Sequence, residues 1–446
     1  MRALSIGPRA AGCFVNGVVI LGLLASNGSW AQDTAAFVPG EFADLEVSGR
    51  RPLHPCVVAA WPFAVSNYRM DLRVSGSYDS NMLRNSLVKN LQRGGFVERS
   101  TREASRFEAG TMGRFGQSID GKWTFYHCGV KSGKGLGPGP ATLSMGYHDL
   151  LGARFTKDAF DLVFFGNKAY AGRTADLSRT AHERIRYMTL DFGLPGLFGK
   201  GSMFEQHIVF GLDLNTSDLR HAVLYTAPDG QDIQAVLRGN YLKRDTTQYA
   251  GFDNIGYAIS ARWLIEHRRE RAKYSVLLGF SDLGAIRWEK AFRYTAETSY
   301  TYRGINVQDV FDVAGVVVNE QTAIDSLGIQ TKHHARVRIL PFKVYGVIYA
   351  QLGARSSGTF SIDQRYVVGY LPHVRGLVLR GIGRYMAAGP SVDAGGFSSL
   401  GPKGWRVGLH VQRRSVRWNL ALSSSNVIGL FSDRARGAAA ELVVGY

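Results

Sequence analysis

Apolar and polar residues alternate along the C-terminal three-fifths of the chain, in runs of roughly eight to twelve residues that each end in a break. In residues 254–266 the apolar positions are Ile255, Tyr257, Ile259, Ala261, Trp263 and Ile265. Residues 405–412 and 416–422 alternate in the same way. Because successive side chains of a strand point to opposite sides, each run predicts a β-strand with one apolar and one polar face.

The breaks between these runs distinguish a membrane barrel from a soluble sandwich. A sandwich buries its apolar faces between two sheets, whereas a barrel turns them to lipid and keeps its polar faces in a wet lumen. Short breaks at 228–230, 267–272 and 413–414 alternate with long ones at 289–330 and 388–403. Short periplasmic turns and long outer loops are typical of transmembrane barrels. Counting back from a periplasmic C-terminus places all three short breaks on the periplasmic side.

The N-terminus predicts export from the cytoplasm. Residues 1–31 combine Arg2 and Arg9 with an apolar stretch at 13–24 and small residues at 29 and 31, which is the pattern of a cleaved secretory signal. An uncleaved anchor is the weaker alternative, because a spanning helix needs roughly 20 apolar residues. We therefore expect the protein in the cell outer membrane.

The predicted fold is all-β: a transmembrane antiparallel β-barrel of about 14 to 16 strands with an irregular N-terminal segment. The last run, 437–446, ends on an aromatic residue, which suits the membrane–water boundary. We expect a signal at 1–31, an N-terminal segment at 32–140 and the barrel at 141–446. Its strands are predicted near 141–155, 160–168, 184–193, 205–213, 220–226, 231–239, 254–266, 273–287, 332–340, 342–352, 361–370, 375–386, 404–412, 415–422 and 437–446.

The segment 32–140 is less regular. Residues 68–80 could form a first strand, and residues 81–110, with helix-like spacing, could form a loop helix or part of a plug. Cys56 and Cys128 remain after signal removal. In an oxidising compartment they could form a disulfide, or they could be two separate buried thiols.

The composition fits an envelope barrel and indicates its partners. The chain has 53 glycines, 24 phenylalanines and 20 tyrosines, which favour a β-rich fold with an aromatic surface. Its net charge is +17, and removal of the two arginines in the signal leaves +15. A basic chain favours anionic partners. We expect outer-membrane lipid and lipopolysaccharide, the barrel-assembly machinery and possible envelope proteins, and no nucleic acid.

No motif for catalysis or for a cofactor stands out. There is no Gly-x-Ser-x-Gly with a plausible triad, and residues 133–137 lack the spacing of a phosphate loop. We predict no cofactor, no metal site and no enzyme activity, with an outer-membrane enzyme as the lesser alternative. The candidate site residues instead lie on predicted polar faces, where they would line the lumen: Arg262, Arg406, His410, Gln412, Arg417 and Asn419.

The lumen arginines have two interpretations. They could line a path for anions or polar solutes, or they could pair with lumen carboxylates such as Glu266 and stiffen the wall. Buried charges usually have partners, which favours pairing. A paired wall can still surround an open lumen.

Three stretches, 166–174, 224–230 and 282–288 followed by 302–311, resemble an uncharacterised family of Gram-negative outer-membrane β-barrel proteins, a domain of unknown function. That family is distantly similar to the long-chain fatty-acid transporter barrels. The resemblance covers roughly residues 60–446 and implies a barrel, but no established activity and no functional residues. We therefore expect a porin-like transporter or channel for a small or hydrophobic solute. The alternative is a structural or docking component of an envelope or secretion assembly.

Overall fold

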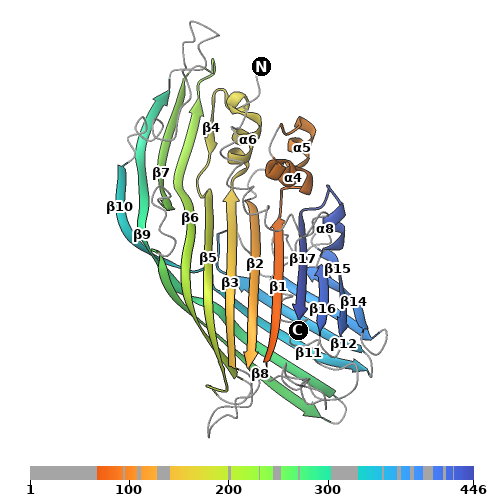
Figure 1. The fold of residues 1–446 in the computed structure, drawn as a ribbon. Helices are drawn as coiled ribbons and strands as arrows, with labels where there is room; N and C mark the ends of the chain where they lie inside the picture. Colours follow the sequence, from red (N-terminus) through yellow and green to blue (C-terminus); the bar gives the residue numbers. More distant parts are fainter. Residues whose placement is uncertain are drawn as a thin grey trace.

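Most of the described chain forms one antiparallel sheet (Figure 1). The computed structural model describes residues 68–93, 96–107, 112–127, 141–198, 202–230, 232–244, 253–269, 272–302, 330–353, 356–368, 373–381, 386–394, 405–414, 418–424 and 426–446.

Within these residues, fourteen strands form a closed barrel. The first and last strands pair to close the ring, with Asp71 opposite Gly445 and Asp79 opposite Gly437. The barrel strands are β1 (Tyr68–Ser80), β2 (Gly113–His127), β3 (Ala141–Phe155), β5 (Ala181–Pro195), β6 (Ser202–Thr226), β8 (Ile255–Arg269), β9 (Ala272–Tyr302), β11 (Lys343–Gly353), β12 (Ser356–Arg365), β13 (His373–Gly381), β14 (Met386–Ala394), β15 (Trp405–Arg414), β16 (Asn419–Ser424) and β17 (Gly437–Gly445).

Two long strands, β6 and β9, extend the sheet beyond one rim of the barrel (Figure 1). The distal part of β6 pairs with β4 (Arg173–Asp176) and β7 (Ile233–Arg244). In turn, β7 pairs with the distal part of β9, which also pairs with β10 (Gln330–Ile339). Residues 340–342 alone separate β10 from β11, and both strands follow the same register along β9.

The two rims of the barrel differ. At the rim that we call the turn end, β8 meets β9 and the chain finishes at Tyr446 (Figure 1). The opposite rim, the helix end, carries α4 (Asn85–Arg93), α5 (Arg99–Ala104), α6 (Lys157–Phe165), η3 (Asn167–Tyr170) and α8 (Val427–Phe431). An apolar cluster that includes Leu87, Phe107 and Phe160 packs α4, α6 and α8 onto β1 and β17.

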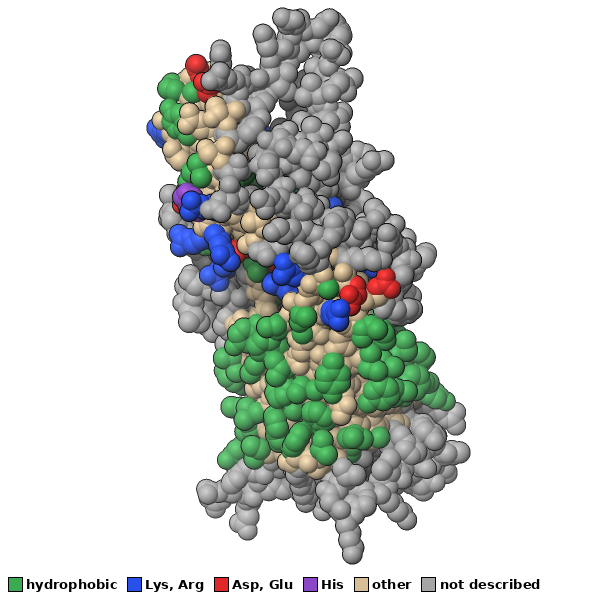
Figure 2. All heavy atoms as spheres, turned by 90° about the vertical axis from the view of Figure 1, so that its left-hand side faces the viewer, with side chains coloured by type: hydrophobic (Ala, Val, Ile, Leu, Met, Phe, Trp, Pro, Cys, Tyr) green, Lys and Arg blue, Asp and Glu red, His purple; other side chains and the backbone are tan. Residues whose placement is uncertain are grey.

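The outer surface carries the apolar band that lipid requires. On β17, Leu442 and Val444 are exposed, whereas Glu441 and Val443 are buried on the inner face. Apolar side chains gather in a band over the half of the barrel near the turn end, and charged side chains border it toward the helix end (Figure 2). An apolar outer band on a closed antiparallel barrel is the architecture of outer-membrane barrels. The predicted fold class is therefore confirmed.

Ion pairs mark the border of the band on β3, β5 and β6. There, Arg184 Nη2 lies 2.7 Å from Asp149 Oδ2, and Arg186 Nη2 lies 2.6 Å from Asp213 Oδ2. Among the described residues, no helix is long and apolar enough to cross a membrane.

The strand number agrees with the prediction, but several predicted strands are wrong. Residues 160–168 lie largely in α6, where Phe160 and Phe164 have the i, i+4 spacing of a helix. Residues 220–226 and 231–239 form a hairpin beyond the rim and do not cross the barrel. Residues 332–340 and 342–352 together make one crossing. The sequence pattern missed β2, and it missed β14 (Met386–Ala394), which contains Pro390 and lies mostly in the predicted loop 388–403.

Two further predictions differ from the structure: the side on which the 228–230 turn lies, and the residue at which the barrel strands begin. The 228–230 turn lies at the tip of the extension, beyond the helix end, because β6 runs on for 25 residues. The barrel begins at Tyr68 rather than at residue 141, and residues 68–80 are indeed its first strand. Residues 81–107 include the loop helices α4 and α5. The predicted signal and both cysteines lie outside the described residues.

Candidate functional site in the barrel lumen

The predicted lumen residues on β15 and β16 lie on the inner face and contact protein groups. Gln412 Nε2 donates a hydrogen bond to Asn419 Oδ1 (2.9 Å). Arg406 Nη2 donates to Asp79 Oδ1 of β1 (2.5 Å). The carboxylate that pairs with Arg406 is thus Asp79. The side chain of Glu266, the partner named from the sequence, is not among those that the structure describes.

The structure does not bring the predicted residues together into one site. His410 is fully buried on β15, and Arg417 lies outside the described residues. Only Arg262, on β8, borders the internal cavity described next. Whether these residues line a path for solutes stays a prediction.

The inner face encloses a cavity of about 90 Å³ that is lined mainly by charged and hydroxyl side chains. They come from β1, β2, β3, β5, β6, β8, β9 and β11, so strands from one half of the ring converge on it. The lining residues are Arg73, Ser75, Asp120, Lys122, His148, Asp191, Met203, Glu205, His207, Ser260, Ala261, Arg262, Ser281, Asp282, Lys343 and Tyr345.

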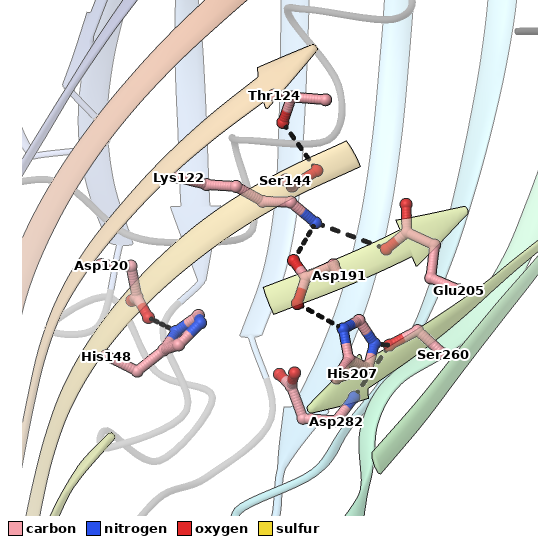
Figure 3. A network of polar contacts seen from close by, with 10 residues as sticks. All are labelled: Asp120, Lys122, Thr124, Ser144, His148, Asp191, Glu205, His207, Ser260 and Asp282. Atoms are coloured by element: carbon pink, nitrogen blue, oxygen red, sulfur yellow. Dashed lines mark hydrogen bonds and ion pairs between the residues drawn. The ribbon is translucent and has the colours of Figure 1, made fainter. Parts of the chain in front are cut away.

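Lys122 connects two carboxylates at the centre of this site. Its Nζ lies 3.2 Å from Asp191 Oδ2 and 3.4 Å from Glu205 Oε2 (Figure 3). Arg262 interacts electrostatically with Glu205 from the next strand along the wall. Charges at this depth are tolerated because each has an opposite partner.

Asp191, His207 and Ser260 form a continuous hydrogen-bonded row (Figure 3). His207 Nδ1 lies 2.7 Å from Asp191 Oδ1, and His207 Nε2 lies 2.6 Å from Ser260 Oγ. An ionised carboxylate can only accept, so Nδ1 carries a proton. In the neutral imidazole, Nε2 is then the acceptor and Ser260 the donor.

A backbone irregularity places Ser260 in this row. The pairing of β8 with β9 shifts between Ile259 and Ala261, and Asp282 on β9 has a positive φ of 59°. Its backbone N–H donates to Ser260 Oγ (3.0 Å). Bulges and left-handed non-glycine residues are costly and concentrate at functional sites.

A second histidine–carboxylate pair lies nearby without a serine. His148 Nδ1 lies 2.7 Å from Asp120 Oδ1 (Figure 3). The ring of His148 stacks on Tyr187 with centroids 4.6 Å apart. Within the described residues, no group of three or more histidine, cysteine or acidic side chains is arranged to hold a metal ion.

An apolar cluster lies on the inner face of β3, β5, β6, β8 and β9, between the cavity and the helix end. It includes Tyr187, Trp288 and Leu340, all almost completely buried. Along β6, the inner face changes from His207 in the cavity to Val209 in this cluster. Leu340 lies in the break between β10 and β11, and its N–H is bonded to the Gly284 carbonyl. A solute that moves along this side of the lumen therefore meets apolar side chains beyond the charged cavity.

Beyond the cluster, the segment after β12 reaches across the mouth of the barrel. Val368 N lies 3.3 Å from Glu183 Oε2 of β5, and Arg338 Nη2 of β10 lies 2.5 Å from Glu183 Oε1. A Cβ on Gly152 of β3 would collide with the Val368 carbonyl oxygen, so glycine permits the close approach. Glu183 therefore binds the crossing segment through Val368 and is itself held by Arg338 of β10.

Sequence reasoning missed most of this site. Ser260 belongs to the polar face that the alternation of residues 254–266 identifies, but nothing distinguishes it from its neighbours. Asp191 and His207 alternate along their strands with apolar residues that face outward. This alternation predicts that both side chains point into the lumen. Their meeting depends on the barrel register and on the bulge at Asp282, which no local pattern shows.

No known protein family and no curated protein matches the chain. Among solved structures, the Pseudomonas putida toluene transporter TodX is 7% identical over 94% of this chain and 93% of that chain, with a TM-score of 0.35. The translocator domain of the autotransporter NalP from Neisseria meningitidis is 8% identical over 94% and 98%, with a TM-score of 0.28. A Rh. blastica porin mutant is 7% identical over 85% and 98%, with a TM-score of 0.25. Identities and TM-scores this low do not indicate a function.

Proposed function

We propose that this protein is an outer-membrane barrel that admits a small solute to its lumen and passes it across the membrane. The supporting observation is the charged cavity inside the barrel wall. A barrel with a purely structural role can fill its interior with packed side chains, since small barrels commonly do. Here, opposite charges from many strands converge on a space that remains open.

The lining favours a small polar solute over a purely hydrophobic one. Four cations (Arg73, Lys122, Arg262 and Lys343) and four carboxylates (Asp120, Asp191, Glu205 and Asp282) border the cavity. A solute that carries both a donor and an acceptor group can exchange hydrogen bonds with such a wall, whereas an apolar one only desolvates it.

The passage requires movement at the helix end. The cluster of Tyr187, Trp288 and Leu340 and the segment fastened by Glu183 lie between the cavity and the outside. Such obstructions are compatible with a gated or selective barrel, and they argue against a wide, permanently open pore.

Docking to another envelope protein is the second candidate function. The helix end exposes large apolar side chains, with Phe96 69%, Val163 72% and Phe431 82% exposed. Exposed apolar groups can mark an interaction surface. This function needs no conducting lumen, so conductance distinguishes the two candidates.

The ion selectivity of the purified protein in planar bilayers tests the first candidate. Arg262→Glu reverses a charge on the cavity wall, so we expect the reversal potential to shift toward cation preference. The matched control is Arg287→Glu, because Arg287 is exposed on the outer surface beside Glu289, and it should leave selectivity unchanged. Equal selectivity in the wild type and both folded variants would contradict a path through the cavity.

A further inference from the structure

We propose that Ser260, His207 and Asp191 form a serine-hydrolase triad inside the barrel, which acts on short-chain carboxylic esters. Ser260 Oγ is 2.6 Å from His207 Nε2, and His207 Nδ1 is 2.7 Å from Asp191 Oδ1. A nucleophile bonded to a base that a third group orients is the defining arrangement of such sites, whatever the fold. This activity goes beyond passage of a solute and does not depend on it.

The orientation of the row suits catalysis. Asp191 Oδ2 is held by Lys122 Nζ at 3.2 Å, which leaves Oδ1 to fix the histidine ring. With Nδ1 protonated, His207 presents Nε2 as the base to Ser260. Asp191 is thus a positioning residue, whereas Ser260 and His207 touch the reacting atoms.

Ser260 also meets the two further requirements of a nucleophile. It borders the cavity, so a substrate carbonyl can approach Oγ. The backbone N–H of Asp282 donates to Oγ at 3.0 Å, which orients the hydroxyl so that its proton points to His207 Nε2.

The reaction is ester hydrolysis with water as the co-reactant. Ser260 Oγ forms a bond to the carbonyl carbon while its proton passes to His207 Nε2. The carbon–oxygen bond of the ester breaks, and the alcohol leaves with that proton. Water then attacks the acyl-serine, gives its proton to His207, and releases the carboxylic acid as the proton returns to Ser260. A cavity of about 90 Å³ suits a short acyl chain.

The polar wall also limits the substrate. Lys122, Arg262 and Lys343 bring positive charge to the cavity in which the carbonyl oxygen would become negative. Esters with a polar or charged alcohol fit this lining better than long-chain lipids do. We therefore expect p-nitrophenyl acetate to be turned over much faster than the p-nitrophenyl ester of a long fatty acid.

The test uses the full protein folded in detergent, with p-nitrophenyl acetate and a short-chain alkyl fluorophosphonate as probes. The fluorophosphonate should attach to Ser260, as located by peptide mass spectrometry. Ser260→Ala and His207→Gln should each lower the esterase rate by roughly 10³-fold or more. Asp191→Asn should slow labelling and change its pH profile, which a merely structural role would not do.

Control variants of the same residue types show whether the loss of activity is specific to Ser260 and His207. Ser100→Ala removes an exposed serine of α5, and His221→Gln removes an exposed histidine in the distal part of β6; neither residue lines the cavity, and both variants should keep the wild-type rate. If Ser260→Ala fails to fold, Ser260→Cys should react with iodoacetamide far faster at neutral pH than Ser281→Cys, because its thiol replaces the hydroxyl that is hydrogen-bonded to His207. A folded wild type that neither labels nor hydrolyses, label on another residue, or equal thiol reactivity would overturn the proposal.

Discussion

Leu422 tests the inside–outside assignment at the scale of one residue. It lies midway along β16, with its side chain 56% exposed on the outer face, next to Ser423 on the inner face. Leu422→Arg places a charge in the apolar band, which should lower the free energy of unfolding by roughly 2–4 kcal/mol near the membrane midplane. Urea unfolding in lipid vesicles measures this, with Leu422→Ala as the control. An equal cost for both variants would show that the position does not face lipid.

Asp161 carries a pH-dependent contact outside the membrane region. Burial raises the pKa of this carboxyl, but hydrogen bonds from Arg106 and Lys157 outweigh burial and hold the pKa below its ordinary value. Arg106 Nη2 lies 2.8 Å from Asp161 Oδ2. A carboxyl with a depressed folded-state pKa gives its full stabilisation above the unfolded value of about 4 and loses it as the pH falls through the folded value.

We therefore expect α6 to lose protection from amide exchange as the pH falls below about 4, after correction for the intrinsic exchange rate. Asp161→Asn should lose that protection already at neutral pH and remove the pH dependence. Glu289→Gln is the control, because Glu289 is exposed on β9 and pairs with Arg287, away from α6. Unchanged protection of α6 in Asp161→Asn would show that this contact does not hold the helix.

Side-chain direction is the part of the site that alternation along a strand addresses. Alternation placed His410, Gln412 and Asn419 on the polar face, and their side chains are buried on the inner face. Partners were beyond prediction: Arg406 meets Asp79, 327 residues away in the chain. Such pairs depend on the closure of β17 onto β1, which brings together strands from opposite ends of the sequence.

At the scale of elements, the errors have a common physical cause. A strand that leaves the membrane keeps its alternation, so β6 and β9 look like several crossings. The reverse error affects β14, where Pro390 and neighbouring small residues hide a strand that the barrel nevertheless pairs on both sides. Helix α6 is apolar enough to resemble a short buried strand. The period of the pattern shows that a stretch is extended and which of its faces is apolar. The number of membrane crossings depends instead on which strands pair across the sheet.

The obstruction at the helix end is also a property of elements. It combines the break at Leu340, the apolar cluster and the segment that Glu183 fastens. None of these is visible in alternation, because each depends on contacts across the lumen. Their arrangement predicts that the barrel is closed until the segment or the cluster moves.

At the scale of the whole molecule, the closed barrel with its outer apolar band was predictable, since lipid imposes one requirement on every crossing strand. The contents of the lumen were not, because polar inner faces tolerate many arrangements. The proposed function therefore depends most on whether the lumen is a solute path that the helix end obstructs.

Single-channel conductance in planar bilayers tests that claim most directly, by comparing the wild type with Glu183→Ala and Leu340→Ala. The first variant releases the crossing segment, and the second removes part of the apolar cluster. Leu422→Ala, on the lipid face, serves as the matched control. We expect small, infrequent openings in the wild type and the control, and larger or longer openings in both lumen variants. Folded lumen variants that conduct no more than the wild type would contradict the account.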